Sequence, residues 1–173
     1  MTTYSFIISC RPTDERDHDE IIDALFEAGC DDALVTERFG TFVVDFDREA
    51  TTFAKAFFSA INAVCAAGLL PLRVGPDPLV NASEIAARAN LTRQAVSNYV
   101  TGKRGSGFPT PFAQHDTPSP LWRWHDVACW LAALKTTQVN HNAILRAHWI
   151  DRANNVVLPK VIERAKRKAA HAA

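Results

Sequence analysis

The sequence predicts an α+β fold, and three observations carry this prediction. Strand-like and helix-like patterns alternate through residues 1–76 in the order βαββαβ. The run Gly75–Pro78 then interrupts the regular patterns with two prolines and a glycine. Helical periodicity dominates the rest, first over residues 79–135 and then over residues 138–173. We therefore expect an N-terminal α+β domain, a second domain and a C-terminal helical extension, with those bounds.

The elements expected in the first domain follow from short apolar runs and helical spacing. Strands are predicted over residues 4–10, 31–37, 41–46 and 70–74, with helices from His18 to about Gly29 and from Thr51 or Thr52 to about Ala67. This order, in about 75 residues, is that of a ferredoxin-like split βαβ unit: an antiparallel sheet with two helices on one face. Pro71 predicts that the last strand lies at an edge of the sheet. Such folds serve enzymes, sensors and dimerisation modules alike.

Composition places limits on the class of protein. The 173 residues are 47% hydrophobic and 22% charged, which is ordinary for a soluble globular chain. No apolar run approaches the roughly 20 residues that a membrane span needs. The four cysteines are scattered and form no CxxC pair, so neither a zinc ribbon nor a disulfide scaffold is predicted. The first residues lack the basic-then-apolar pattern of a signal peptide. We expect a cytoplasmic protein with free thiols and no cofactor.

The formal net charge of zero hides an asymmetry along the chain. Residues 1–78 hold 6 Lys and Arg against 14 Asp and Glu, whereas residues 79–135 hold 6 against 3. Residues 136–173 hold 7 against 2. DNA would repel the first segment and attract the other two. The segments are therefore expected to do different jobs.

A helix-turn-helix is predicted between Asn81 and Gly102. Asn81 can cap the first helix, with Glu84 closing a capping box. Asn90 stands where the turn needs a left-handed backbone, and Thr92 can cap the second helix. The outer face of that helix and the residues beyond it carry donors that suit base edges and phosphates. The expected DNA-binding residues here are Thr92, Arg93, Gln94, Ser97, Asn98, Thr101, Lys103 and Arg104. The alternative is an ordinary helical hairpin that binds nothing.

The residues that follow extend the pattern. The strand expected over Leu121–Trp124 puts Trp122 and Trp124 on one inward face, and a helix is expected from Asp126. With SEIAARANLTRQAVSNYV, FPTP and WRWHDVACWL, the segment resembles the winged helix-turn-helix proteins of the MerR superfamily, in particular the AlpA and excisionase-like branch. The resemblance covers about a third of the chain. It implies that Arg93, Gln94, Ser97 and Asn98 read the major groove and that Arg123 is a wing or backbone contact.

Other chemistry has weaker support. Six acidic residues between the first strand and the first helix could hold a divalent metal for phosphodiester cleavage. The interpretation we favour is that they offset the helix dipole; these residues are Asp14, Glu15, Asp17, Asp19, Glu20 and Asp23. His125 and Cys129 are one helical turn apart but make no metal site alone. We expect no metal, no catalytic residue and no enzyme, with a DNA-anchored, metal-dependent nuclease as the alternative.

The C-terminal extension carries an apolar stripe and a basic tail. The stripe fits either packing across the first domain or pairing with a second copy. The tail fits either the helix dipole or phosphate contact; it comprises Lys160, Arg164, Lys166, Arg167 and Lys168. The sequence therefore predicts a homodimeric, sequence-specific regulator of transcription that binds double-stranded DNA. A repressor of the autoregulating-antitoxin or phage and mobile-element type is expected, with an excisionase-like DNA-bending protein as an alternative. The first domain could bind a protein partner, such as a toxin or a regulator.

Overall fold

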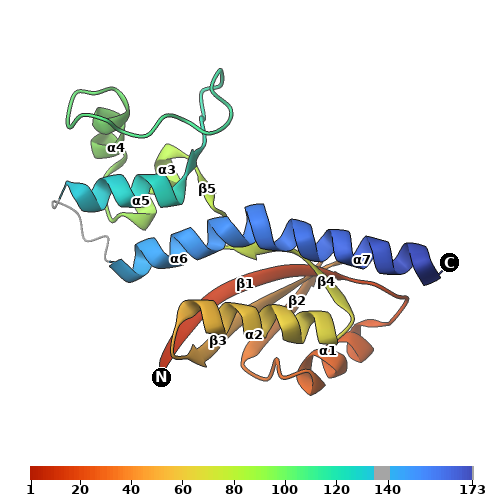
Figure 1. The fold of residues 1–173 in the computed structure, drawn as a ribbon. Helices are drawn as coiled ribbons and strands as arrows, with labels where there is room; N and C mark the ends of the chain where they lie inside the picture. The colour runs from red at the N-terminus through yellow and green to blue at the C-terminus, as the bar shows by residue number, and fades with distance from the viewer. Residues whose placement is uncertain (135–140, 173) are drawn as a thin grey trace. The chain divides into compact units, whose positions relative to one another are not determined.

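The computed structural model describes residues 1–134 and 141–172, and the chain divides into two compact units (Figure 1). Unit 1 comprises Met1–Pro76 and Arg152–Ala173, and unit 2 comprises Asp77–Asp151. Side chains are described throughout these ranges except at residues 141, 168, 169 and 172. No helix in the described ranges combines the length and the apolar character that crossing a membrane requires.

Unit 1 contains a four-stranded antiparallel sheet, which confirms the predicted α+β class. Its elements along the chain are β1 (Thr2–Pro12), α1 (His18–Glu27), β2 (Ala33–Arg38), β3 (Thr41–Ala50), α2 (Phe53–Ala66) and β4 (Leu69–Gly75). The strands lie in the order β2-β3-β1-β4, and every neighbouring pair is antiparallel. The strand with Pro71 is at the edge of the sheet, as its proline predicted.

One face of this sheet forms the core of unit 1. Phe6 and Ile8 of β1 are buried opposite Phe46 and Val44 of β3, because alternate residues of paired strands share a face. Helix α2 packs on that face, where Phe57 meets the ring of Phe6 edge to face. Helix α1 lies on the same side (Figure 1). It begins with a complete capping box at its first turn, as its acidic start allows.

The last helical segment of the chain completes unit 1. Helix α6 (His141–Arg152) of unit 2 is followed by a π-helical segment, η1 (Ala153–Val157), and by α7 (Leu158–Ala172). The π-helical segment ends just before Pro159, and the chain stays helical through it. Helix α7 lies along β4, with Leu158 fully buried. Packing on the first domain was one of the two uses expected for this stripe. Residues 138–140 of the predicted extension lie outside the described ranges.

Unit 2 is a helical cluster with a two-stranded ribbon. Its elements before α6 are β5 (Leu79–Val80), α3 (Ala82–Arg88), α4 (Arg93–Val100), β6 (Trp122–Arg123) and α5 (Trp124–Ala133). Strands β5 and β6 pair antiparallel. The core joins Ile85 of α3 and Val96 of α4 to Val127 and Leu131 of α5. The third helix therefore packs on the first two.

The strand expected over Leu121–Trp124 is wrong at its last residue. Leu121 forms a bridge with Ala113, Trp122 and Arg123 form β6, and Trp124 is the first residue of α5. Trp122 is 2% exposed, whereas Trp124 is only half-buried. The backbone N–H of Trp124 donates to the carbonyl of Pro78 at 2.7 Å, which fixes the point where the strand ends and the helix begins. The two indoles therefore do not share one strand face.

Candidate nucleic-acid interface

A tight turn sets the angle between α3 and α4. The Asn81 side chain accepts from the backbone of Glu84, and the Glu84 carboxylate accepts from the N–H of Asn81 at 2.7 Å. Asn90 has φ +52°, the left-handed conformation predicted for it. Thr92 then caps α4 by accepting from the N–H of Ala95 at 3.1 Å. The two caps and the turn residue are confirmed as local features, because each depends on neighbouring residues only.

Helix α4 has a buried side and an exposed polar side. Val96 and Tyr99 are 0% and 4% exposed in the core of unit 2. Six of the predicted residues on and just after the helix have exposed side chains: Arg93, Gln94, Ser97, Thr101, Lys103 and Arg104. Asn98 is half-buried, and its Oδ1 accepts from Gln94 Nε2 at 3.2 Å. The exposed side therefore presents a guanidinium, two amides and a hydroxyl together.

Two predicted contacts are engaged with the helix itself. The Thr92 hydroxyl accepts the capping hydrogen bond, and the Thr101 hydroxyl donates to the carbonyl of Ser97 at 2.8 Å. These bonds are local and strengthen the two ends of α4. The hydroxyls of both threonines are therefore used in hydrogen bonds within α4. The side chains of Arg93, Gln94 and Ser97 are exposed on the surface of the helix.

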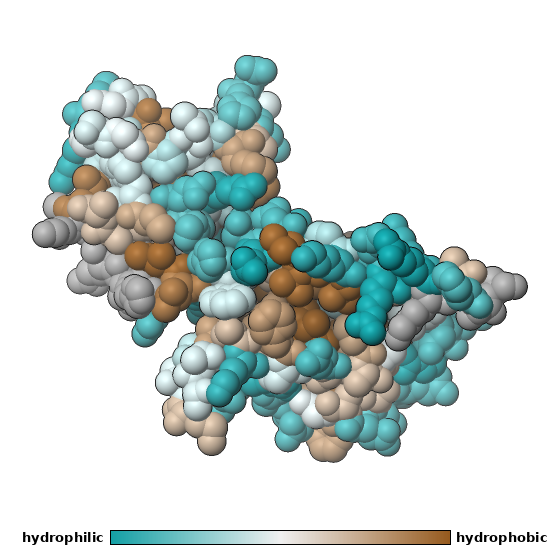
Figure 2. All heavy atoms as spheres, viewed as in Figure 1, coloured by the Kyte–Doolittle hydropathy of each residue, from teal (hydrophilic) through white to brown (hydrophobic). Residues whose placement is uncertain are grey.

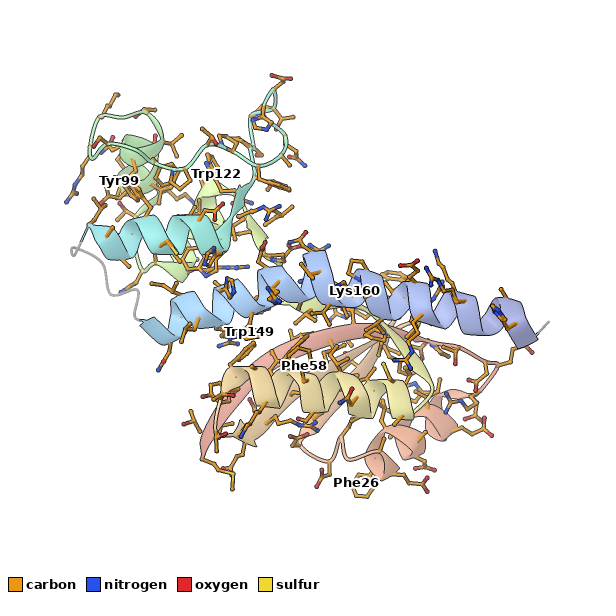
Figure 3. All side chains as sticks on the ribbon, viewed as in Figure 1. Phe26, Phe58, Tyr99, Trp122, Trp149 and Lys160 are labelled. Carbon is orange, nitrogen blue, oxygen red and sulfur yellow. The ribbon has the colours of Figure 1, made fainter. Side chains whose placement is uncertain are left out.

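The loop after α4 rests on an aromatic cluster (Figure 3). Tyr99, Phe108, Trp122 and Trp130 make edge-to-face ring contacts with centroids 5.0–6.0 Å apart. Trp130 Nε1 donates to the Ser106 carbonyl at 3.0 Å, which fastens the loop to α5. The cluster thus holds the loop that carries the two predicted cations, Lys103 and Arg104.

Gly105 lies close to the cluster, next to Ser106 in the same loop. Its φ is +71°, and a Cβ there would meet the Trp130 ring at 3.2 Å. The Arg104 guanidinium lies over the Tyr99 ring, 5.6 Å from its centroid. Sequence reasoning missed this role for the loop. The signal available was the spacing of three glycines in GKRGSG, next to aromatic residues.

Arg123 occupies a different environment from the other predicted contacts. Its Nη1 lies 3.3 Å from Asp151 Oδ2, and its guanidinium covers the ring of Phe112 at 4.0 Å. Its side chain is 30% exposed. The loop that precedes it is closed by a bridge between Ala113 and Leu121, with exposed residues between them. Arg123 therefore differs from the exposed residues on and after α4, because its guanidinium is held by Asp151 and Phe112.

The alternative chemistries have no assembled site in the described residues. No group of three or more His, Cys, Asp or Glu side chains there could hold a metal ion. His125 Nε2 lies 3.6 Å from the Cys129 sulfur, and the rings of His125 and His148 are 5.2 Å apart. Burial raises the pKa of the Cys129 thiol, with Asp126 acting in the same direction, so the reactive thiolate form is disfavoured.

Comparison with known proteins gives no match: no protein-family model, no curated protein and no solved structure is significantly similar to this chain.

Proposed function

We propose that this protein is a sequence-specific regulator of transcription that binds double-stranded DNA through α4. Helices α3 and α4 serve as a helix-turn-helix, with the ribbon and loop around residues 112–121 as a wing. The observation that carries the proposal is the polar side of α4, which is exposed opposite the buried Val96 and Tyr99. A helix of this kind fits the major groove of B-DNA, which is about 12 Å wide.

The exposed residues have the chemistry that base reading needs. An arginine makes bidentate hydrogen bonds to guanine, and asparagine or glutamine does so to adenine. Arg93 and Gln94 supply these groups on the first turn of α4, and Asn98 lies one turn further on. Lys103 and Arg104 follow on the loop that the aromatic cluster holds, where they suit phosphate oxygens. In the AlpA and excisionase-like proteins that this segment resembles, the corresponding helix reads DNA.

Unit 1 is proposed as the regulatory part of the molecule. Its strand order β2-β3-β1-β4, with two helices over one face, supports a ferredoxin-like module. An excess of carboxylates over residues 1–78 keeps its sheet and α1 from competing for DNA. We propose that this module mediates dimerisation or binds a protein partner, so that a homodimer reads a repeated site in the cytoplasm and represses transcription. Half-sites would then lie about 34–36 Å apart, one turn of DNA.

Selection from fragmented genomic DNA tests the proposal. Purified full-length protein is incubated with the fragments, and the retained DNA is sequenced. We expect a shared sequence motif that disappears when the Arg93→Ala, Asn98→Ala double variant is used, because the groups proposed to read bases are gone. A matched variant, Arg11→Ala with Lys55→Ala, changes exposed residues of unit 1 and should retain the motif. Retention without a motif, or Mg²⁺-dependent cleavage of the fragments, would contradict the proposal.

A further inference from the structure

Helix α7 is amphipathic, and its apolar side is already occupied. Leu158 is 1% exposed, and Val161, Ile162 and Ala165 are half-buried, all on the side that lies along β4. These positions span one arc of the helix, because successive residues are separated by about 100°. The part of the predicted apolar stripe that lies on α7 therefore packs against β4 within unit 1.

The opposite side of α7 carries a stripe of cations. Lys160, Arg164 and Arg167 are spaced by four and three residues, so they share one face. All three are exposed, and the Arg167 side chain is 75% exposed. Lys160 is labelled on α7 in Figure 3, and Figure 2 shows hydrophilic side chains along this helix. We call these three residues the α7 stripe.

Local pairing and the helix dipole do not account for the α7 stripe. Arg167 pairs with Glu163 one turn earlier. Within the described ranges, neither Lys160 nor Arg164 has a carboxylate within ion-pair distance. Stabilisation by the helix dipole falls off within the last turn of a helix. The helix ends at Ala172, so Lys160 and Arg164 lie more than one turn before that end.

We infer that the α7 stripe is a second contact for the phosphate backbone of duplex DNA, separate from the base-reading side of α4; this inference rests on the proposed function. From Lys160 to Arg167 the stripe is about 10 Å long, at 1.5 Å per residue. One strand of duplex DNA presents a phosphate about every 3.4 Å of axis, so about three intervals between phosphates span the length of the stripe and each cation has a phosphate near it. A membrane surface is the less favoured partner, because an amphipathic helix binds there by inserting its apolar face beside the charged lipid contacts. That face of α7 packs on β4.

The salt dependence of DNA binding tests this inference. Full-length protein is titrated against a labelled duplex of arbitrary sequence between about 50 and 200 mM KCl. The stripe variant is Lys160→Gln, Arg164→Gln, Arg167→Gln. The matched control, Arg11→Gln, Arg38→Gln, Lys55→Gln, removes the same charge from exposed cations elsewhere in unit 1. We expect the slope of log K against log salt to become shallower by about 2–3 in the stripe variant, at 0.9 per phosphate contact. The control should keep the wild-type slope.

The outcomes separate this inference from the proposed function. An unchanged slope in the stripe variant, or an equal change in the control, overturns the inference and leaves base reading by α4 intact. A shallower slope in the stripe variant alone supports it, even if genomic selection retains no sequence motif and the proposed function is wrong. The third outcome concerns anionic phospholipid vesicles. If the wild type and the control co-sediment with them, the stripe variant does not, and the salt slope of DNA binding is the same for all three proteins, the inference is overturned in favour of a membrane surface. Failure of the wild-type protein to bind the duplex at the lowest salt overturns both.

Discussion

The side chain of Asn154 makes two hydrogen bonds with the backbone of Val74. Its Nδ2 donates to the Val74 carbonyl at 2.8 Å, and its Oδ1 accepts from the Val74 N–H at 3.0 Å. Val74 belongs to β4, the edge strand of the sheet, and Asn154 belongs to η1, eighty residues later. A side-chain amide thus satisfies edge groups that would otherwise be open to another strand.

Replacing Asn154 with Leu should destabilise the protein. The leucine fills the same space but leaves the Val74 N–H and carbonyl without partners, which costs about 1–3 kcal/mol. Urea denaturation followed by circular dichroism measures the change in the free energy of unfolding. Lys166→Leu, at an exposed position of α7, is the matched control and should alter stability by less than about 0.5 kcal/mol. Equal effects at the two positions would show that the pair with Val74 contributes nothing.

Alanine substitutions at Gly102 and Gly105 test backbone strain and steric crowding separately in the loop after α4. Both have positive φ, +70° and +71°, but only Gly105 has a neighbour that an added Cβ would crowd. Alanine at Gly102 should cost about 1–2 kcal/mol from strain alone. Alanine at Gly105 should cost more and should also change the tryptophan emission spectrum, because the Trp130 ring must move. An unshifted spectrum for Gly105→Ala would mean that the loop does not rest on Trp130.

Arg123 and Lys103 should behave in opposite ways when each is changed to Met. The Arg123 guanidinium pairs with Asp151, so its loss should lower the free energy of unfolding by about 1–3 kcal/mol and leave the salt slope of DNA binding unchanged. Lys103 is exposed, so its loss should leave stability unchanged and make the slope shallower by about 1. A shallower slope for Arg123→Met would instead support the wing or backbone contact that the sequence predicts for it.

Alkaline pH should destabilise the fold through Cys10. Burial raises the pKa of this thiol from its ordinary value of 9.0 to about 12, with Cys30 and Cys65 acting in the same direction. The folded state therefore holds the proton more tightly than the unfolded state. The stabilisation is complete below pH 9 and is lost between pH 9 and 12, at up to about 1.4 kcal/mol per pH unit. Urea midpoints between pH 7 and 10.5 should fall less steeply for Cys10→Ala than for the wild type; parallel curves would refute this assignment.

Sequence reasoning succeeded where the cause is local. Alternation in β1 and β3, the caps at Asn81 and Thr92, and the left-handed Asn90 depend on residues within one turn or one strand pair. It failed at Trp124, because the run Trp-Arg-Trp alternates like a strand and only a hydrogen bond to Pro78, 46 residues earlier, ends that strand.

The remaining features depend on residues that the sequence places far apart. The sequence does not predict the role of Asn154, since an asparagine in a helical pattern gives no sign of an edge strand eighty residues away. In the loop after α4 it predicts only the two cations, because nothing local shows that Gly105 approaches Trp130. For α4, the sequence predicts the buried residues Val96 and Tyr99 and the exposed residues Arg93, Gln94 and Ser97. It is less accurate at the borders between the two sides, because Asn98 is half-buried and Val100, one turn after Val96, is 41% exposed.

The most direct test of base reading by α4 compares two duplexes and two proteins. One duplex carries the motif recovered by genomic selection, and the other carries the same bases in permuted order. For Arg93→Ala, we predict a loss of about 1–3 kcal/mol of binding free energy on the first duplex, with a much smaller loss on the second. Equal losses on both duplexes, or none on either, would contradict the claim that this side of α4 reads DNA sequence.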